Sequence, residues 1–327
     1  MITIGNTWLW IGFCVFVVLA LIVDFIVLKK EGAHRVGMRE AAIWSAVWVA
    51  LSLVFAAILW WWLNSQFGRD TADARTLEFL TGYLIEKSLA IDNIFLFLTI
   101  FTYFALPAEL QKRALLIGIV AAIVLRALLI FAGSYLIEQF HWVLYLFGVF
   151  LVITGIKMWW SAGKESSLGD NPVLRLLRRV MRVSPDYDGE RLFTRRDGVR
   201  MATPMLLIVA LIGITDVIFA VDSIPAIFAI TEDPFIVLTS NIFAVLGLRA
   251  MYFLLADMAD RFHLLPYGLA VILLFVGTKM LIVDVLHIPP LISLLIILGI
   301  LVATIFLSVR HRPKAAPLQP LLEDRTQ

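Results

Sequence analysis

Cysteine and charge are both scarce in this chain of 327 residues. Cys14 is the only cysteine, which excludes an intrachain disulfide framework and a site built from several thiolates. Charged residues make up only 16% of the chain, against about a quarter of a soluble domain. Hydrophobic residues make up 61%, and the mean hydropathy is +0.93. These proportions exclude an ordinary soluble enzyme and indicate an all-α polytopic membrane protein.

Histidine is also scarce, and none lies in the interior of an apolar run. The five histidines fall in expected loops or at the ends of runs: His34, His141, His263, His287 and His311. The sequence has no HExxH motif, no Ser/His/Asp set and no intramembrane nucleophile beside a base, so we expect no enzymatic activity. We also expect no organic cofactor and no nucleic-acid partner. No basic residue precedes the first apolar run, so no cleaved signal peptide is expected.

Nine apolar runs reach the length of about 20 residues that a membrane-spanning helix needs. We predict transmembrane helices at 8–28, 42–63, 78–104, 114–137, 142–160, 203–230, 235–256, 266–285 and 291–309. Lys and Arg gather in alternate connections, above all in 161–202, whereas the opposite face has only Arg69 and Arg75. The positive-inside rule then places the N-terminus outside and the C-terminus in the cytoplasm.

This topology divides the chain into five segments. They are 1–76 with two N-terminal helices, 77–160 with three helices, the basic cytoplasmic loop 161–202, 203–285 with three helices, and 286–327 with the last helix and a cytoplasmic tail. Within the loop, a helical pattern starts at Asn171-Pro172, with arginines on one face. Such a helix can lie on anionic headgroups, or it can serve only as a positive-inside determinant. The tail from Arg312 is polar and proline-rich and is expected to be disordered.

Two stretches inside these apolar runs repeat one arrangement of carboxylates. One reads EKSLAIDNIF from Glu86 to Phe95, and the other reads DVIFAVDSIP from Asp216 to Pro225. In each, an acid is followed six residues later by Asp and then by a small polar residue. A charge at the bilayer centre costs about 2.5–3.5 kcal/mol on insertion scales. Four carboxylates at matching positions therefore indicate a function.

The repetition continues into the following spans. Leu125-Arg126-Ala127 matches Leu248-Arg249-Ala250, and Gly155-Ile156-Lys157-Met158 matches Gly277-Thr278-Lys279-Met280. The repeating unit has three helices, spans 3–5 and spans 6–8, so the second copy must enter the membrane from the opposite side. This predicts two inverted three-helix repeats, whose carboxylates face each other near the membrane midplane.

The ligands available at that midplane are hard oxygens. The predicted metal-handling residues are Glu86, Asp92, Asn93, Asp216, Asp222 and Ser223, with Thr215 and Asn241 nearby. Carboxylate and carbonyl oxygens suit Mg, Ca or Mn, whereas imidazole and thiolate suit Zn or Cu. Crowded carboxylates also let protons compete with metal, which offers a route to proton-coupled exchange. Pro225 and the length of spans 3 and 6 favour a broken or kinked helix at the site.

Basic residues inside the spans support a second interpretation. The candidate counter-charges or gating residues are Lys87, Arg126, Lys157, Arg249 and Lys279. In a purely structural network, the carboxylates would only neutralise these residues. The repeated Arg and Lys can also serve both purposes, balancing an empty site and being released when metal binds, or the two repeated lysines can snorkel to the interface. Asp24, alone in the first span, is expected at the interface or in an ion pair.

The two acidic motifs carry a family resemblance. GYLIEKSLAIDN, from Gly82 to Asn93, and DVIFAVDSIPA, from Asp216 to Ala226, resemble the TerC family of integral membrane proteins, most closely its Alx-like, alkaline-induced branch. The resemblance covers nearly the whole chain and implies a bacterial inner-membrane manganese exporter, linked to manganese detoxification, alkaline stress and tellurite resistance. It also implies that the motif carboxylates handle the metal. The family usually has Glu where this chain has Gly213, so one expected ligand or proton carrier is missing.

Two functions from different classes therefore compete. The first is a secondary transporter that exports Mn²⁺ from the cytoplasm in exchange for protons, with the lipid bilayer, Mn²⁺ and protons as its partners. The second is a membrane scaffold for a metal, alkaline or tellurite stress complex, which recruits soluble stress proteins through the 161–202 loop and transports nothing itself.

Overall fold

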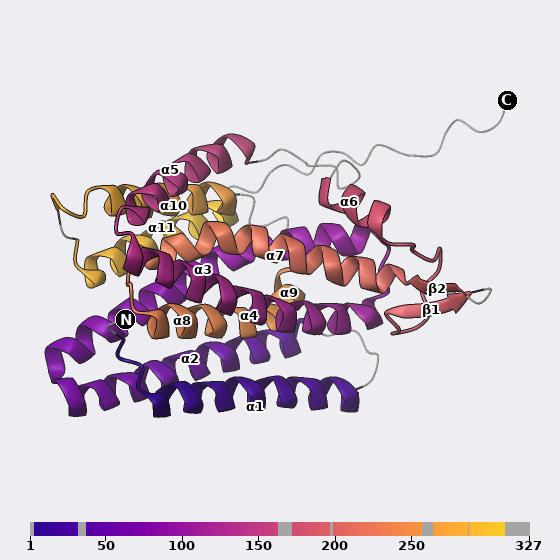
Figure 1. Cartoon of the computed structure of the whole chain (residues 1–327), viewed down its shortest axis with the longest axis horizontal. Coiled ribbons are helices and arrows are strands. Elements are labelled where there is room, and N and C mark those ends of the chain that lie inside the picture. Colours follow the sequence, from indigo (N-terminus) through magenta and orange to yellow (C-terminus); the bar gives the residue numbers. More distant parts are fainter. Residues whose placement is uncertain are drawn as a thin grey trace.

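The computed structural model describes residues 3–31, 37–162, 172–196, 199–256, 264–286 and 288–310, without the side chains of residues 27–31, 92 and 196. Long helices lie side by side along the longest axis of the molecule, and a small β-hairpin closes one end (Figure 1). The N-terminus lies toward the end opposite the hairpin. The predicted disordered tail from Arg312 lies outside the described residues.

The described elements are eleven helices and two strands. In chain order they are α1 (Thr7–Glu31), α2 (Met38–Phe67), α3 (Arg69–Tyr103), α4 (Ala108–Gln139), α5 (Val143–Ser161), α6 (Pro172–Val180), β1 (Phe193–Arg196), β2 (Val199–Ala202), α7 (Pro204–Phe228), α8 (Pro234–Leu246), α9 (Leu248–Ala256), α10 (Leu265–Leu281) and α11 (Pro290–Arg310). The expected all-α membrane architecture is thus present, with one short antiparallel hairpin added.

Helices lie at each of the nine predicted spans, but fewer of them meet the length and composition of a membrane crossing. Six helices in the described part of the chain do so: α1, α2, α4, α5, α7 and α11. The bent pair α8 and α9 raises the number to seven if it forms one crossing. The helix α10 has only 17 residues, and α3 carries Glu86, Lys87 and Asp92 within its apolar part.

Of the broken or kinked helix predicted in spans 3 and 6, the break is wrong. The helix α3 runs unbroken through 35 residues, and α7 runs unbroken through 25 with Pro225 inside it. Pro225 has no N–H to donate to the Val221 carbonyl, so one helical hydrogen bond is missing there while α7 continues to Phe228. The break lies instead at Gly247, where α8 and α9 meet at 42°. A Cβ at Gly247 would collide with the Lys87 ammonium, so a residue without a side chain allows the close approach of α3.

Small residues bring α5 and α10 into close contact. A Cβ at Gly277 would lie 2.9 Å from the Gly148 carbonyl oxygen, and one at Gly155 would lie 3.0 Å from the Ala270 carbonyl oxygen. The residue number rises along α5 as it falls along α10, so the two helices are antiparallel. Small residues are the usual means by which membrane helices approach closely. In the same bundle, α3 packs against α8 and α4 packs against α7.

The basic loop forms a small layer on the end of the bundle that carries the hairpin (Figure 1). The helix α6 begins at Pro172, and its Leu174 side chain is buried. Arg178 lies over the rings of Tyr103 and Phe104 at the end of α3. The Tyr187 hydroxyl donates a hydrogen bond of 2.8 Å to the Phe104 carbonyl, and burial raises the pKa of this hydroxyl. The helix α6 is therefore anchored to the protein on one face.

Candidate functional site: a buried carboxylate and arginine cluster

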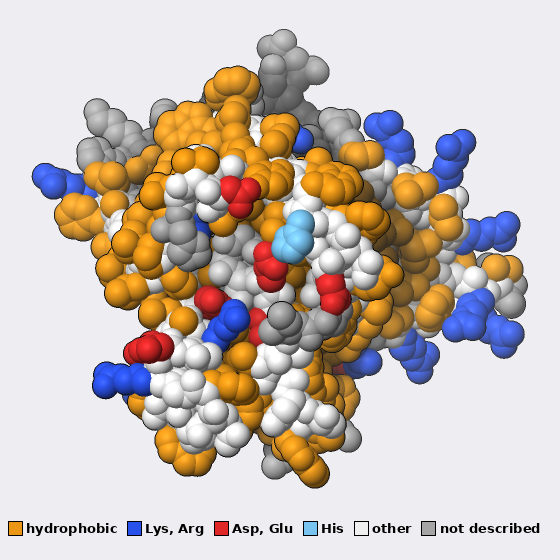
Figure 2. Space-filling view, turned by 60° about the vertical axis from the view of Figure 1, so that its left-hand side comes forward, with side chains coloured by type: hydrophobic (Ala, Val, Ile, Leu, Met, Phe, Trp, Pro, Cys, Tyr) orange, Lys and Arg blue, Asp and Glu red, His pale blue; other side chains and the backbone are white. Residues whose placement is uncertain are grey.

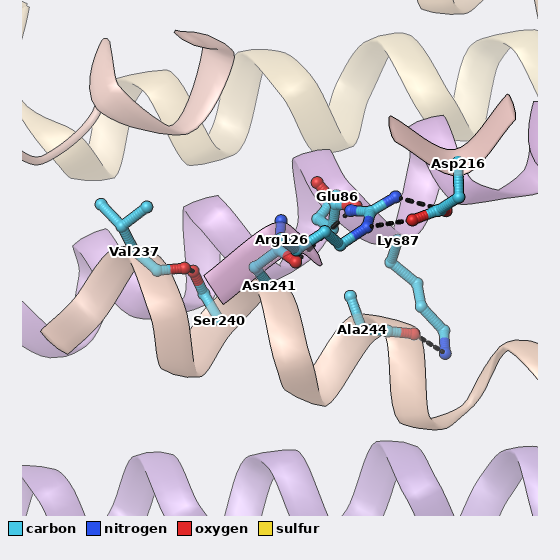
Figure 3. Close-up of polar contacts among 8 residues, drawn as sticks. All are labelled: Glu86, Lys87, Arg126, Asp216, Val237, Ser240, Asn241 and Ala244. Atoms are coloured by element: carbon cyan, nitrogen blue, oxygen red, sulfur yellow. Dashed lines mark hydrogen bonds and ion pairs between the residues drawn. The ribbon is translucent and has the colours of Figure 1, made fainter. Parts of the chain in front are cut away.

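Arg126 of α4 lies between carboxylates that come from two other helices (Figure 3). Its Nε and Nη2 atoms each donate to one Asp216 oxygen at 2.9 Å, which makes the pair bidentate. Its Nη1 atom donates to Glu86 Oε1 and, at 3.3 Å, to Asn241 Oδ1. Arg126, Glu86 and Asp216 are each only 1% exposed. The guanidinium therefore makes charge-assisted hydrogen bonds in an environment from which water is largely excluded.

Four helices of the bundle bring these groups together. Glu86 comes from α3, Asp216 from α7 and Arg126 from α4, while α8 contributes Asn241. The two acids that begin the repeated motifs thus share one partner in the core, although 130 positions separate them in the sequence. The group between them is the guanidinium of Arg126, one of the candidate counter-charges.

A small cavity of about 50 Å³ adjoins this cluster. Its polar lining consists of Glu86, Asn93, Arg126, Thr154, Asp222 and Ser223, and its apolar lining of Leu89, Met158, Phe219 and Leu273. Glu86 Oε2 and Ser223 Oγ are buried without any hydrogen-bond partner. Unsatisfied buried oxygens are costly and rare in native structures. These two oxygens, beside the Asp222 carboxylate, fit a cavity that receives a cation or water.

The predicted set of four converging carboxylates is not seen as a closed ligand shell. Among the residues that the structure describes, no three His, Cys, Asp or Glu side chains are grouped closely enough to hold a metal ion. Both oxygens of Asp216 are engaged by Arg126, and the Asp92 side chain lies outside the described atoms. Glu86, Asp216 and Asp222 carry three formal negative charges against the two positive charges of Arg126 and Lys157. An excess of negative charge therefore surrounds the cavity.

Lys87 lies next to this cluster but turns away from it (Figure 3). Its ammonium lies 3.4 Å from the Ala244 carbonyl, in the last turn of α8, and 5.9 Å from the centre of the Tyr83 ring. The final carbonyls of a helix lack intrahelical donors and carry partial negative charge. Lys87 therefore stabilises the broken end of α8 and does not neutralise Glu86.

Of the other candidate counter-charges, Arg249 and Lys279 lie apart from the cluster, whereas Lys157 lies near Asp222. Arg249 forms an ion pair with Asp24 of α1, and the Asp24 side chain is 8% exposed. Lys157 is exposed on α5. Lys279 lines an outer hollow of about 410 Å³ together with Arg75, Glu78 and Glu232. Figure 2 shows acidic and basic side chains gathered around a hollow on this end of the molecule, with Lys and Arg crowded along the opposite edge.

Two residues of the site, Thr154 and Met158 of α5, were not predicted from the sequence. Both side chains line the cavity. The sequence shows only that the segment Gly155-Ile156-Lys157-Met158 is repeated, and it does not indicate that this segment faces the site. At Gly213, where the family resemblance leads us to expect Glu, the backbone is buried. No neighbouring atom lies within 4 Å of the place of a Cβ. The α7 face one turn before Asp216 therefore has free space for a side chain.

Comparison with known proteins agrees with the helical architecture and the motifs. Residues 71–316 match the family described as "Integral membrane protein TerC family". The chain is 55% identical over 306 residues to the "Putative membrane-bound redox modulator Alx" of Escherichia coli (strain K12), covering 94% of this chain and 95% of that protein. It is 50% identical to the protein of the same name from Photorhabdus laumondii subsp. laumondii, covering 94% and 96% of the two chains.

A third relative, the "Uncharacterized membrane protein STKORF319" of Myxococcus xanthus, is 47% identical and covers 95% of this chain and 96% of its own. No solved structure matches the chain. The family match and the long similarity to bacterial membrane proteins agree with the resemblance carried by the two acidic motifs. The chain therefore belongs to the TerC family of integral membrane proteins and is Alx-like.

Proposed function

We propose that this protein is a secondary transporter of the bacterial inner membrane that exports Mn²⁺ from the cytoplasm in exchange for protons. The observation that carries the proposal is the cavity beside Arg126, with its unpartnered Glu86 Oε2 and Ser223 Oγ next to Asp222 and Asn93. All four side chains supply hard oxygens, which suit Mn²⁺. The direction of transport and the choice of Mn²⁺ among hard cations follow the family resemblance of the motifs.

The contact between α5 and α10 supports the inverted-repeat part of the proposal. In the sequence repeat, Gly155 corresponds to Gly277, and the same offset takes Gly148 to Ala270. The close approach of Gly155 to the Ala270 carbonyl therefore has an equivalent in the approach of Gly277 to the Gly148 carbonyl. Such reciprocal contacts are what a two-fold axis produces. The pairing of α3 with α8 and of α4 with α7 follows the same exchange.

In this topology, nine crossings place the N-terminus outside and the basic loop in the cytoplasm. The short α10 and the charged α3 then count as crossings because they pack inside the bundle, where charges and breaks can be satisfied by protein. The outer hollow lined by Glu78 and Glu232 lies on the periplasmic side. We assign it as the place where the ion is released.

Proton coupling follows from the same carboxylates. An ion that leaves Glu86 and Asp222 leaves buried negative charge behind, which protons can neutralise. Alternating occupancy by one divalent cation and by protons would then drive exchange without a further cofactor.

The cellular manganese content tests this proposal. Cells that express the wild-type chain should hold less manganese under manganese load than cells that express Asp222→Asn at the same membrane level. Glu109→Gln, an exposed acid at the start of α4, serves as the control and should behave as wild type. If properly inserted Asp222→Asn lowered cell manganese as well as wild type, the transport proposal would be wrong.

A scaffold function is the second candidate, and the loop supplies one observation for it. The layer of α6 and the hairpin exposes the apolar side chains Leu176, Val180, Phe193 and Val199 among arginines. Such a mixed surface fits a soluble partner or anionic headgroups. If this function holds, replacing these four residues by Ser should abolish stress protection while manganese flux stays absent in all variants.

The names of the relatives suggest a redox role, which would need a redox group. This chain supplies one thiol, Cys14, on α1. A dithiol–disulfide couple needs two thiols, so thiol chemistry within one chain gives no support to that role. The carboxylate cavity gives more support to ion transport.

A further inference from the structure

The position of Arg126 has a consequence for the ion that the cavity receives. We propose that Arg126 is a tethered cation, which competes with the transported divalent ion for Glu86 and Asp216. This inference rests on the proposed function and assigns Arg126 a regulatory part in the same site. The guanidinium would hold the carboxylates while the site is empty and would release them as the ion enters.

The geometry shows which oxygens the competition concerns. Asp216 directs both oxygens to Arg126 at 2.9 Å, and Glu86 directs Oε1 to it. Of these four carboxylate oxygens, only Glu86 Oε2 is left facing the cavity without a partner. An entering ion can therefore meet one Glu86 oxygen, Asp222 and neutral ligands first. It gains the remaining carboxylate oxygens only when the guanidinium gives them up.

Because these side chains are buried, the release of Arg126 and the binding of the cation are coupled. The three side chains are almost fully buried, so bulk water cannot replace the guanidinium when it leaves. A buried carboxylate without a partner is strongly unfavourable. Release of Arg126 therefore requires that a cation or protons arrive, and cation binding requires that Arg126 be released. By linkage, the arginine weakens the binding of the ion by the same factor by which the ion weakens the arginine pairing.

The site also provides one neutral acceptor for the released guanidinium. Asn241 Oδ1 already accepts a hydrogen bond of 3.3 Å from Nη1, while its Nδ2 is buried without a partner. An arginine that keeps the Asn241 contact can leave one carboxylate without losing all its acceptors. Asn241 is thus a fixed acceptor about which Arg126 can pivot.

Equilibrium binding of Mn²⁺ to the purified, detergent-solubilised full chain tests the inference, with free Mn²⁺ followed by its electron paramagnetic resonance signal. Arg126→Gln removes the competitor, so it should bind Mn²⁺ at least tenfold more tightly than wild type. Arg126→Lys keeps the charge but cannot form the bidentate pair, so its affinity should lie between the two. Arg249→Gln, which removes the repeated arginine outside the cluster, should leave the affinity unchanged.

The outcomes separate this inference from the proposed function. If wild type binds Mn²⁺ but Arg126→Gln binds it no more tightly, the competition is wrong while the transport proposal stands. If neither protein binds Mn²⁺, both are wrong.

A charge-balanced pair of variants covers the case in which Arg126→Gln does not fold. The double variant Arg126→Gln/Asp216→Asn removes one charge of each sign, and it is compared with Asp216→Asn alone. Competition predicts at least tenfold tighter binding in the double variant, because Glu86 is then free of the guanidinium. Equal affinities of these two variants would overturn the inference.

Discussion

Arg126 and Arg249 are the middle residues of matching Leu-Arg-Ala segments in the two repeats, but they have different partners. Arg126 lies 1% exposed between the acids of the two motifs. Arg249 pairs with Asp24 of α1, a helix outside both repeats, at the more exposed edge of the bundle. One copy of the repeat thus places its arginine in the candidate ion site, and the other uses it to attach a neighbouring helix. Equivalent positions of the sequence repeat thus have different surroundings, and the neighbouring helices determine the partner of each arginine.

The same contrast applies to helix continuity. The arginine helix α4 is unbroken through 32 residues, whereas its counterpart is divided at Gly247 into α8 and α9. Close to this division, Lys87 of the first motif donates a hydrogen bond to the Ala244 carbonyl of α8. The second motif has Val217 at the place of Lys87. The first motif therefore places a charged side chain at a helix end, whereas the second motif has an apolar side chain at the equivalent position.

The largest effect is expected for the carboxylates that line the cavity. Glu86→Gln and Asp222→Asn each remove a ligand oxygen with its charge, and they should lower Mn²⁺ flux roughly 100-fold, near the upper end of the losses known for residues that support metal sites. Flux in proteoliposomes of equal protein content measures this. Retained flux in both variants would show that the cavity is not the ion path.

Loss of the ion pair outside the cluster should affect stability and not ion binding. Arg249→Gln leaves Asp24 buried without its partner, which should lower the free energy of unfolding by about 1–3 kcal/mol, less than a fully buried pair because Arg249 is partly exposed. Thermal unfolding in detergent measures this loss. The double variant Asp24→Asn/Arg249→Gln should recover part of it, and equal losses in single and double variants would contradict the pairing.

Two glycines of facing helices should respond in opposite ways to a methyl group. A Cβ at Gly118 would lie 2.7 Å from Ile212 Cγ2, whereas a Cβ at Gly213 meets nothing within 4 Å. Gly118→Ala should therefore destabilise the fold by about 1–3 kcal/mol. Gly213→Ala should stabilise α7 by about 0.5–1 kcal/mol, because alanine loses less backbone entropy in a helix. Thermal unfolding of the two variants and of wild type measures these changes. A stabilised Gly118→Ala and a destabilised Gly213→Ala would contradict the packing of α4 against α7.

The smallest effect is expected for the exposed lysine of the first repeat. Lys157 lies on the outer surface of α5, and Lys157→Gln should change the free energy of unfolding by less than about 0.5 kcal/mol. It should also leave Mn²⁺ flux within twofold of wild type. A large loss of flux would show that the lysine acts on the neighbouring Asp222 and would bring the two lysines of the repeats into the mechanism.

The sequence predicted the helical class, the positions of the helices and the closeness of Glu86 to Asp216. These follow from apolar runs and from a repeat that places equivalent acids opposite each other. It did not show which of five basic residues would lie between the acids, because Arg126 and Arg249 have the same local pattern. Nor did it place the break at Gly247, which depends on how closely Lys87 of α3 approaches α8. The unpartnered Ser223 Oγ likewise depends on packing, which one helix alone does not reveal.

We propose that the cavity among α3, α4, α5, α7 and α10 carries a divalent cation across the membrane in exchange for protons. The most direct test is Mn²⁺ flux into proteoliposomes with an imposed pH gradient, comparing the wild-type chain with Asp222→Asn. If the cavity is the ion path, the gradient drives Mn²⁺ flux through the wild-type protein, its reversal reverses the flux, and Asp222→Asn carries almost none. Equal flux through wild type, Asp222→Asn and protein-free liposomes would contradict it.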